Sequence, residues 1–136
     1  VRELVRVLKK DHPLIISGQN RYVLSLSLVS EDIDFASKVL SKELPFIMRK
    51  ALKVYTLTPE EFKQMLESNG VRIERMFGKV LTMPLAISYD KLSSENYTQE
   101  FLNKILKIEF DLVDRQDTVS LGAHIQVIGY KKSFRL

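Results

Sequence analysis

Two aspartates separated by one residue have a spacing that could bind a metal ion. Asp32 and Asp34 lie in the segment SEDIDF, residues 30–35. Alternate side chains of a strand point to the same side, so an extended segment can present both carboxylates to one divalent cation. If the segment is a strand, the pair predicts a metal site and a metal-dependent reaction.

The surroundings of this pair resemble the metal-binding signature of the polymerase-beta-like nucleotidyltransferases. Ser17-Gly18 lies fourteen residues upstream, and the run KVYTLTPEEF, residues 53–62, is similar to a strand-then-helix segment of small members of that superfamily. The resemblance implies a divalent metal held by Asp32 and Asp34. The family's Gly-Ser pair stands here in reverse order, and Lys53 or a neutral neighbour occupies the position expected to carry a third carboxylate.

Helix capping is the interpretation of Asp32 and Asp34 that we favour. Apolar residues recur at helical spacing directly after them, up to about residue 42. Carboxylates at a helix N-terminus accept hydrogen bonds from free N–H groups and complement the helix dipole. We therefore expect the two aspartates to begin a helix, and we expect no cofactor.

A basic and aromatic cluster near the end of the sequence is a candidate nucleic-acid interface. It consists of Tyr130, Lys131, Lys132, Phe134 and Arg135. Cations of this kind can contact phosphates, and aromatic rings can stack on bases. The cations that could extend this surface are Arg49, Lys50 and Lys53, and also Arg72, Arg75 and Lys79. The alternative is a final strand with exposed lysines and two core aromatics.

Other chemically capable residues give weaker signals. Glu109 and Asp111 also lie two apart, on an expected strand, where we interpret them as a solvent-exposed face. His12 and His124 are far apart in sequence, and we expect both at the surface. The five glycines are spread singly, so the sequence contains no phosphate-binding loop and no dinucleotide fingerprint.

The composition is that of an ordinary globular domain. The chain has 136 residues, of which 45% are hydrophobic and 28% charged. No apolar run approaches the roughly 20 residues that cross a bilayer, and the absence of cysteine excludes disulfides and thiolate sites. A net charge of +4 permits a polyanionic partner without requiring one. We expect a cytoplasmic protein without membrane contact, in which residues 1–136 form one domain, alone or within a longer chain.

The clearest structural signal lies at residues 58–61. Thr58 can cap a helix, Pro59 suits its first position, and Glu61 can reach back to the cap. The preceding residues 52–57 are rich in strand formers, and Asn69-Gly70 is a typical helix end. A strand should therefore enter a helix over 59–68.

The remaining patterns complete an α+β prediction. We expect a single compact domain with a mixed or antiparallel sheet and three to four helices packed mainly on one face. Its central strand should be 21–29, with Tyr22, Leu24, Leu26 and Leu28 in the core. The other expected elements are helices at 1–10, 33–42, from 46, and at 97–107; a short strand at 14–16; a hairpin over 71–89 that turns near Gly78; and a hairpin of 108–112 with 119–127.

These observations favour a non-enzymatic binding module of an intracellular assembly or regulator, with a nucleic acid or a protein as its partner. One alternative is a nucleotidyltransferase-like metal-dependent enzyme, in which Asp32 and Asp34 would converge with Glu109 or Asp111. Another is a small-molecule-sensing regulatory domain with an apolar cleft between residues 83–89 and strand 21–29. The sequence predicts no particular oligomeric state.

Overall fold

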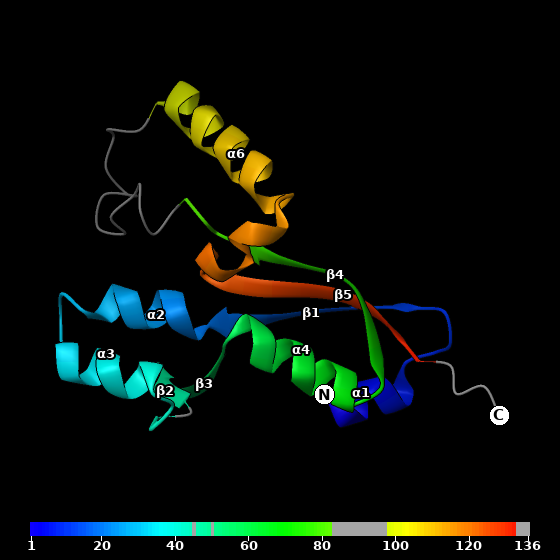
Figure 1. Cartoon of the computed structure of the whole chain (residues 1–136). Coiled ribbons are helices and arrows are strands. Elements are labelled where there is room, and N and C mark those ends of the chain that lie inside the picture. The colour runs from blue at the N-terminus through cyan, green and yellow to red at the C-terminus, as the bar shows by residue number, and fades with distance from the viewer. Residues whose placement is uncertain (45, 50, 83–97, 133–136) are drawn as a thin grey trace.

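Five strands form one mixed sheet in the order β2-β3-β1-β5-β4 (Figure 1). The computed structural model describes residues 1–44, 46–49, 51–82 and 98–132. The strands are β1 (Pro13–Asn20), β2 (Phe46–Arg49), β3 (Leu52–Leu57), β4 (Val71–Lys79) and β5 (His124–Lys131). β1 is parallel to β3 and antiparallel to β5, while β5 is also antiparallel to β4 and β2 to β3. The α+β class with a mixed sheet is therefore confirmed.

The helices are more numerous than predicted. The described residues form five α-helices and one 3₁₀ helix instead of three to four helices. They are α1 (Arg2–Val7), α2 (Arg21–Leu28), α3 (Ile33–Leu40), α4 (Pro59–Ser68), α6 (Gln99–Val113) and the 3₁₀ helix η2 (Gln116–Leu121). In Figure 1, α1 and α4 lie on one side of the sheet, α6 projects from the other side, and α2 packs beside α3 at one end.

The main core lies between α1, α4 and the part of the sheet formed by β1, β5 and β4. Its buried members are Val5, Phe62, Leu66, Val71, Ile125 and Val127. A smaller cluster of Leu24, Val39 and Ile47 fixes α2 and α3 against β2. Two separate clusters of buried apolar side chains thus stabilise the two ends of the molecule.

The predicted central strand 21–29 is wrong, because this segment is helix α2. Asn20 caps the helix, since its side-chain oxygen accepts a hydrogen bond from the N–H of Tyr22. Leu24 is buried, whereas Leu26 is 72% exposed. Leucines at every second position also place Leu24 and Leu28 about one helical turn apart. The same sequence is therefore compatible with a helix that buries one face.

The two predicted helix caps are confirmed. Asp32 accepts a hydrogen bond from the N–H of Phe35 at the start of α3, and Asp34 lies in the first turn. At α4, Thr58 and Glu61 form the reciprocal capping box, with Pro59 at the first helical position. Short polar side chains acting on neighbouring backbone groups are local features, and the sequence predicts them well.

Several predicted boundaries are corrected by the structure. The expected strand 108–112 is the last part of α6, so Glu109 and Asp111 lie on a helix, and residues 116–121 form η2 before β5 begins. β4 passes through Gly78, which pairs with Ile125, instead of turning there. Residues 46–49 form β2 and not a helix, while α1 ends at Val7 and β1 is longer than 14–16. Residues 83–89 lie outside the described part of the chain.

Candidate functional site

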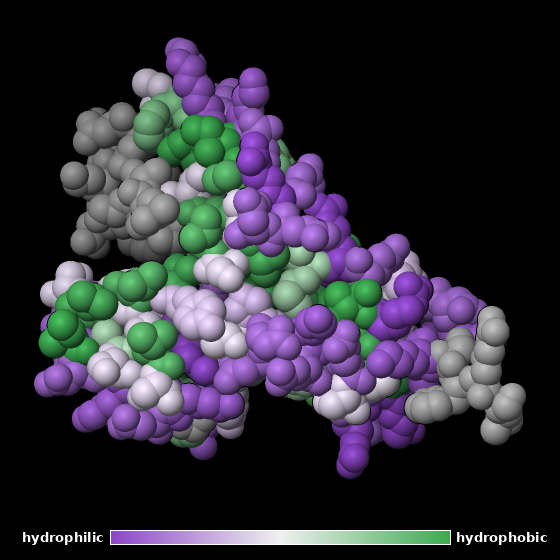
Figure 2. All heavy atoms as spheres, in the orientation of Figure 1, coloured by the Kyte–Doolittle hydropathy of each residue, from purple (hydrophilic) through white to green (hydrophobic). Residues whose placement is uncertain are grey.

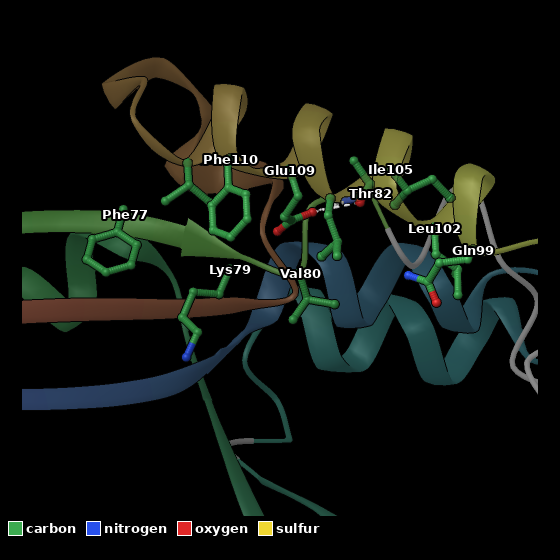
Figure 3. A pocket seen from close by; sticks show the side chains of 11 residues that line it. Phe77, Lys79, Val80, Thr82, Gln99, Leu102, Ile105, Glu109 and Phe110 are labelled. Atoms are coloured by element: carbon green, nitrogen blue, oxygen red, sulfur yellow. Dashed lines mark hydrogen bonds between the residues drawn. The ribbon is translucent and has the colours of Figure 1, made fainter.

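A largely apolar groove of about 590 Å³ lies between α6 and the end of β4. Its lining residues on α6 recur every three to four positions, so one face of the helix borders the groove over its whole length (Figure 3). The residues on the β4 side are Phe77, Lys79, Val80 and Thr82, and those on α6 are Gln99, Leu102, Ile105, Leu106, Glu109, Phe110 and Val113.

Glu109 ties α6 to the chain that follows β4. Its carboxylate accepts hydrogen bonds of 2.8 Å from the N–H of Leu81 and of 2.8 Å from the N–H of Thr82, and one of 2.7 Å from the Thr82 hydroxyl. Figure 3 shows the carboxylate directed at Thr82. Burial would raise the pKa of Glu109, but these hydrogen bonds outweigh it and lower the pKa. The group is therefore an ionised anchor for the helix and a poor proton acceptor.

The surface of α6 is unusually apolar for a helix without buried residues. None of its side chains is fully buried. Phe101, Leu106, Ile108 and Phe110 are 39%, 51%, 52% and 68% exposed. Figure 2 shows hydrophobic residues gathered along one side of α6 and hydrophilic residues along the other. We call these four residues, together with the groove lining, the α6 surface.

A second polar centre joins α2 to α4. The guanidinium of Arg21, which is only 3% exposed, donates to both carboxylate oxygens of Glu61 at 3.0 and 2.6 Å and to the carbonyl oxygen of Thr56 at 3.0 Å. Lys42 donates to Glu61 at 2.9 Å. Glu61 also accepts the N–H of Thr58. Because every group in this network has a partner, it fixes the carboxyl ends of β1 and β3 against α4.

This network predicts a loss of stability in acid. Burial would raise the pKa of Glu61, but Arg21, Lys42 and the N–H of Thr58 lower it to about 2. The folded pKa is thus depressed below the usual 4.5, so the contribution to stability is complete above pH 4.5 and is lost as the pH falls towards 2. With a side chain that is 25% exposed, screening by solvent limits the effect to about 1–2 kcal/mol.

Urea unfolding between pH 2 and 6 checks this expectation. The difference in unfolding free energy between the parent and Glu61→Gln should be largest above pH 4.5 and shrink in acid. The matched control is Glu60→Gln, because Glu60 is the neighbouring glutamate and its side chain is exposed; this variant should show no such trend. A pH-independent difference for Glu61→Gln would contradict the lowered pKa of Glu61.

The structure does not bring the predicted acidic residues together into a metal site. Asp32 is engaged as the cap of α3, and Glu109 is engaged with Leu81 and Thr82. Over the described ranges, no group of three or more acidic or histidine side chains could hold a metal ion. His12 and His124 are both exposed, as expected.

The predicted basic cluster is partly assembled at one end of the sheet. Tyr130 and Lys131 are the last two residues of β5. Arg72 of the neighbouring strand β4 lies over the Tyr130 ring, with 5.4 Å between its Cζ atom and the ring centroid. Together with Asp11 and Lys132 they line a depression of about 530 Å³. The ammonium of Lys131 also donates to the carbonyl oxygens of Arg6 and Leu8 at 3.3 and 3.4 Å, so this lysine also holds the end of α1. The structure thus places Arg72, which the sequence suggested as an extension of the cluster, beside Tyr130, Lys131 and Lys132.

The other predicted cations lie elsewhere. Arg49 and Lys53 belong to the β2–β3 hairpin, and β1 separates β3 from β5 in the sheet order. Lys53 lies over the ring of Phe46 at 4.8 Å. Lys50, Phe134 and Arg135 are outside the described residues. Of the two segments expected to line a small-molecule cleft, residues 21–28 form helix α2, and residues 83–89 lie outside the described residues.

Sequence reasoning missed two features of the site. The groove depends on α6 extending to Val113, and the expected strand 108–112 hid this. The second is the buried position of Arg21, because the alternating pattern predicts a strand there, although Asn20, the last residue of β1, is a common N-cap residue.

Comparison with known proteins finds no family model that matches the chain, and the search of curated proteins also finds no match. In the described parts of the chain, no helix has both the length and the apolar character that a membrane span requires.

Proposed function

We propose that this chain is a non-enzymatic binding module that holds an amphipathic helix of a protein partner against α6. The observation that carries the proposal is the α6 surface: an amphipathic helix of 15 residues, with no buried residue, beside an apolar groove. Exposed apolar surface of this kind marks interaction sites in folded proteins. Helix-in-groove recognition uses such surfaces through anchors at helical spacing.

The extent of the surface favours a protein partner over a small molecule. A volume of about 590 Å³ would by itself suit a small ligand. Ile108 is 52% exposed but does not line the groove. A molecule that fills only the groove would leave this side chain in water. A helix laid along α6, which is roughly 22 Å long at 1.5 Å per residue, can cover the groove and its apolar margin together.

The polar groups nearby support binding and not catalysis. Glu109 is the acidic residue among those that line the groove, and its carboxylate is occupied by the N–H groups of Leu81 and Thr82. This group holds α6 to the chain that follows β4. The proposed module therefore offers a preformed apolar surface with a rigid support.

Photo-crosslinking in the native cell tests the proposal. A benzoylphenylalanine at Leu106, which lines the groove, should form adducts with a partner segment whose apolar residues recur at helical spacing. The matched control is the same substitution at Leu26 of α2, which is 72% exposed. Adducts no more abundant at Leu106 than at Leu26, adducts without that spacing, or a small molecule retained in the groove would each contradict it.

Nucleic-acid binding is a second candidate, favoured by the position of Arg72 beside Tyr130, Lys131 and Lys132. If Arg72, Lys131 and Lys132 contact phosphates of a single strand, the slope of log affinity against log salt should be about −2. A variant with Arg72→Ala and Lys132→Ala should lose most of this slope, whereas Lys63→Ala with Lys38→Ala, two exposed lysines elsewhere, should retain it. The measurement is a titration of labelled single-stranded oligonucleotide at two salt concentrations, and no binding at low salt excludes this candidate.

A further inference from the structure

A β-bulge at Glu74 places two arginines of β4 on the same side of the sheet. In a regular strand, Arg72 and Arg75 would point to opposite faces, because an odd number of positions separates them. The register between β4 and β5 shifts at Glu74, and the extra residue reverses the alternation. The partners of the two arginines on β5 are Tyr130 and Ile128, which lie two apart and share a face. Bulges often lie beside functional sites, where they redirect a side chain.

The two arginines point away from the main core and lie over aromatic rings. The opposite face of β4 contributes to that core through Val71, Ile73 and Met76. Arg72 is exposed, and the Arg75 side chain is 48% exposed. Arg72 lies over the ring of Tyr130, and Arg75 lies over that of Phe77, with 5.1 Å between the Cζ atom of Arg75 and the ring centroid. Cations and aromatic rings therefore alternate on this face.

Tyr130 joins two depressions of the surface. It lines the basic depression beside Arg72, and also a second one of about 550 Å³ between β4 and the end of α6. The charged residues that line the two are the cations Arg72, Arg75, Arg115, Lys131 and Lys132 and the acids Asp11, Glu74 and Asp114. Asp114 is paired with Arg75 at 2.5 Å. We call Tyr130 with these five cations the Tyr130 track, whose charge remains positive after the acids are counted.

We propose that the Tyr130 track binds a single-stranded nucleic acid, with a base stacked on the pair of Tyr130 and Arg72 and with backbone phosphates at the other cations. The inference rests on the second candidate function above and adds to it the path of the strand, its single-stranded form and the stacking residue. Single strands expose the faces of their bases, which stack on aromatic rings and on arginine planes. A duplex keeps those faces inside its own stack, and an acidic protein would need the cations but not the ring.

Titration of labelled single-stranded oligonucleotides of about 12 nucleotides tests the stacking residue, with RNA and DNA in separate arms. Tyr130→Leu should weaken binding by at least about fivefold and leave the salt dependence unchanged, because it removes a ring and no charge. Tyr130→Phe keeps the ring and should bind like the parent. A duplex of the same length should bind more weakly than the single strand. Equal binding of Tyr130→Leu and the parent, or tighter binding of the duplex, would overturn the inference.

The salt dependence tests the path of the strand. With Arg75 and Arg115 added to the other three cations of the track, the slope of log affinity against log salt should steepen from about −2 to about −3.5. Arg75→Gln with Arg115→Gln should return it to about −2. The matched control is Lys38→Gln with Lys63→Gln, two exposed lysines outside the track, which should keep the steeper slope. Because Arg75 and Arg115 are exposed, this arm does not depend on how well Tyr130→Leu folds.

The outcomes separate this inference from the functions proposed above. Leu106→Asp alters the α6 surface and should bind the single strand like the parent, so failure of the α6 proposal would not imply failure here. Binding that depends on Arg72 and Lys132, but not on Tyr130, Arg75 or Arg115, would support the second candidate function and overturn the Tyr130 track. No binding of single strands at low salt would overturn both.

Discussion

Replacing Phe62 by alanine is expected to lower the free energy of unfolding by about 3–5 kcal/mol. Phe62 is 1% exposed and sits in the main core between α4 and the sheet. Its ring comes within 3.4 Å of the position that a Cβ atom on Gly18 would occupy, so helix and strand are in close contact here. Truncation leaves a cavity that the tightly apposed backbone of β1 cannot fill.

The matched control is Phe110→Ala, because Phe110 is 68% exposed on α6. The same change of side chain should shift the free energy of unfolding there by less than about 1 kcal/mol. Urea unfolding of both variants measures the difference. Similar losses for the two would contradict the description of Phe62 as core and of Phe110 as surface.

Gly122→Ala is expected to destabilise the fold by about 2–3 kcal/mol through overpacking. A Cβ atom on Gly122 would lie 2.5 Å from the backbone nitrogen of Lys79 and 2.6 Å from the Cα of Gly78. Both contacts are backbone atoms of β4, so relief requires movement of a strand paired with β5. The chain after β4, including Leu81 and Thr82, should move as well and loosen the hydrogen bonds to Glu109.

Gly70→Ala is the comparison for this prediction. Gly70 has a φ of +81° with no atom within 4 Å of an added Cβ, so alanine there introduces only backbone strain, of about 1 kcal/mol. Chemical unfolding should therefore place Gly122→Ala below Gly70→Ala in stability. The reverse order would show that the close approach between Gly122 and β4 is absent.

The sequence predicts the parts of this fold that are determined locally. The capping box of Thr58 and Glu61 and the cap by Asp32 depend on side chains acting within three residues of themselves. Strand β3 and helix α4 follow directly from that signal. Such features are readable because the capping hydrogen bonds themselves form within three residues, although Arg21 and Lys42 also donate to Glu61.

Tertiary contacts determine the elements for which the sequence prediction is wrong. Residues 21–28 alternate like a strand, but Arg21 is drawn to Thr56 and Glu61, which lie far along the sequence. At the end of α6, Ile108 and Phe110 suggest a strand, yet Glu109 accepts hydrogen bonds from Leu81 and Thr82 as part of a helix. Short alternating apolar runs fit either structure, and long-range partners decide between them.

For the same reason, the candidate site is harder to predict from the sequence than the fold. The groove requires α6 and the end of β4 to lie side by side, and the sequence predicts neither the full length of α6 nor the course of β4 through Gly78. The basic cluster was visible as a run of residues, but its extension through Arg72 depends on the register between β4 and β5.

The most direct test of the central claim is the affinity of the α6 surface for the partner helix that crosslinks to it. The crosslinked segment, made as a labelled peptide, is titrated against the parent, Leu106→Asp and the control Leu26→Asp. We expect Leu106→Asp to weaken binding by at least about tenfold, or about 1.4 kcal/mol, and Leu26→Asp to bind like the parent. Equal affinity of Leu106→Asp and the parent would contradict the claim that α6 and its groove are the binding site.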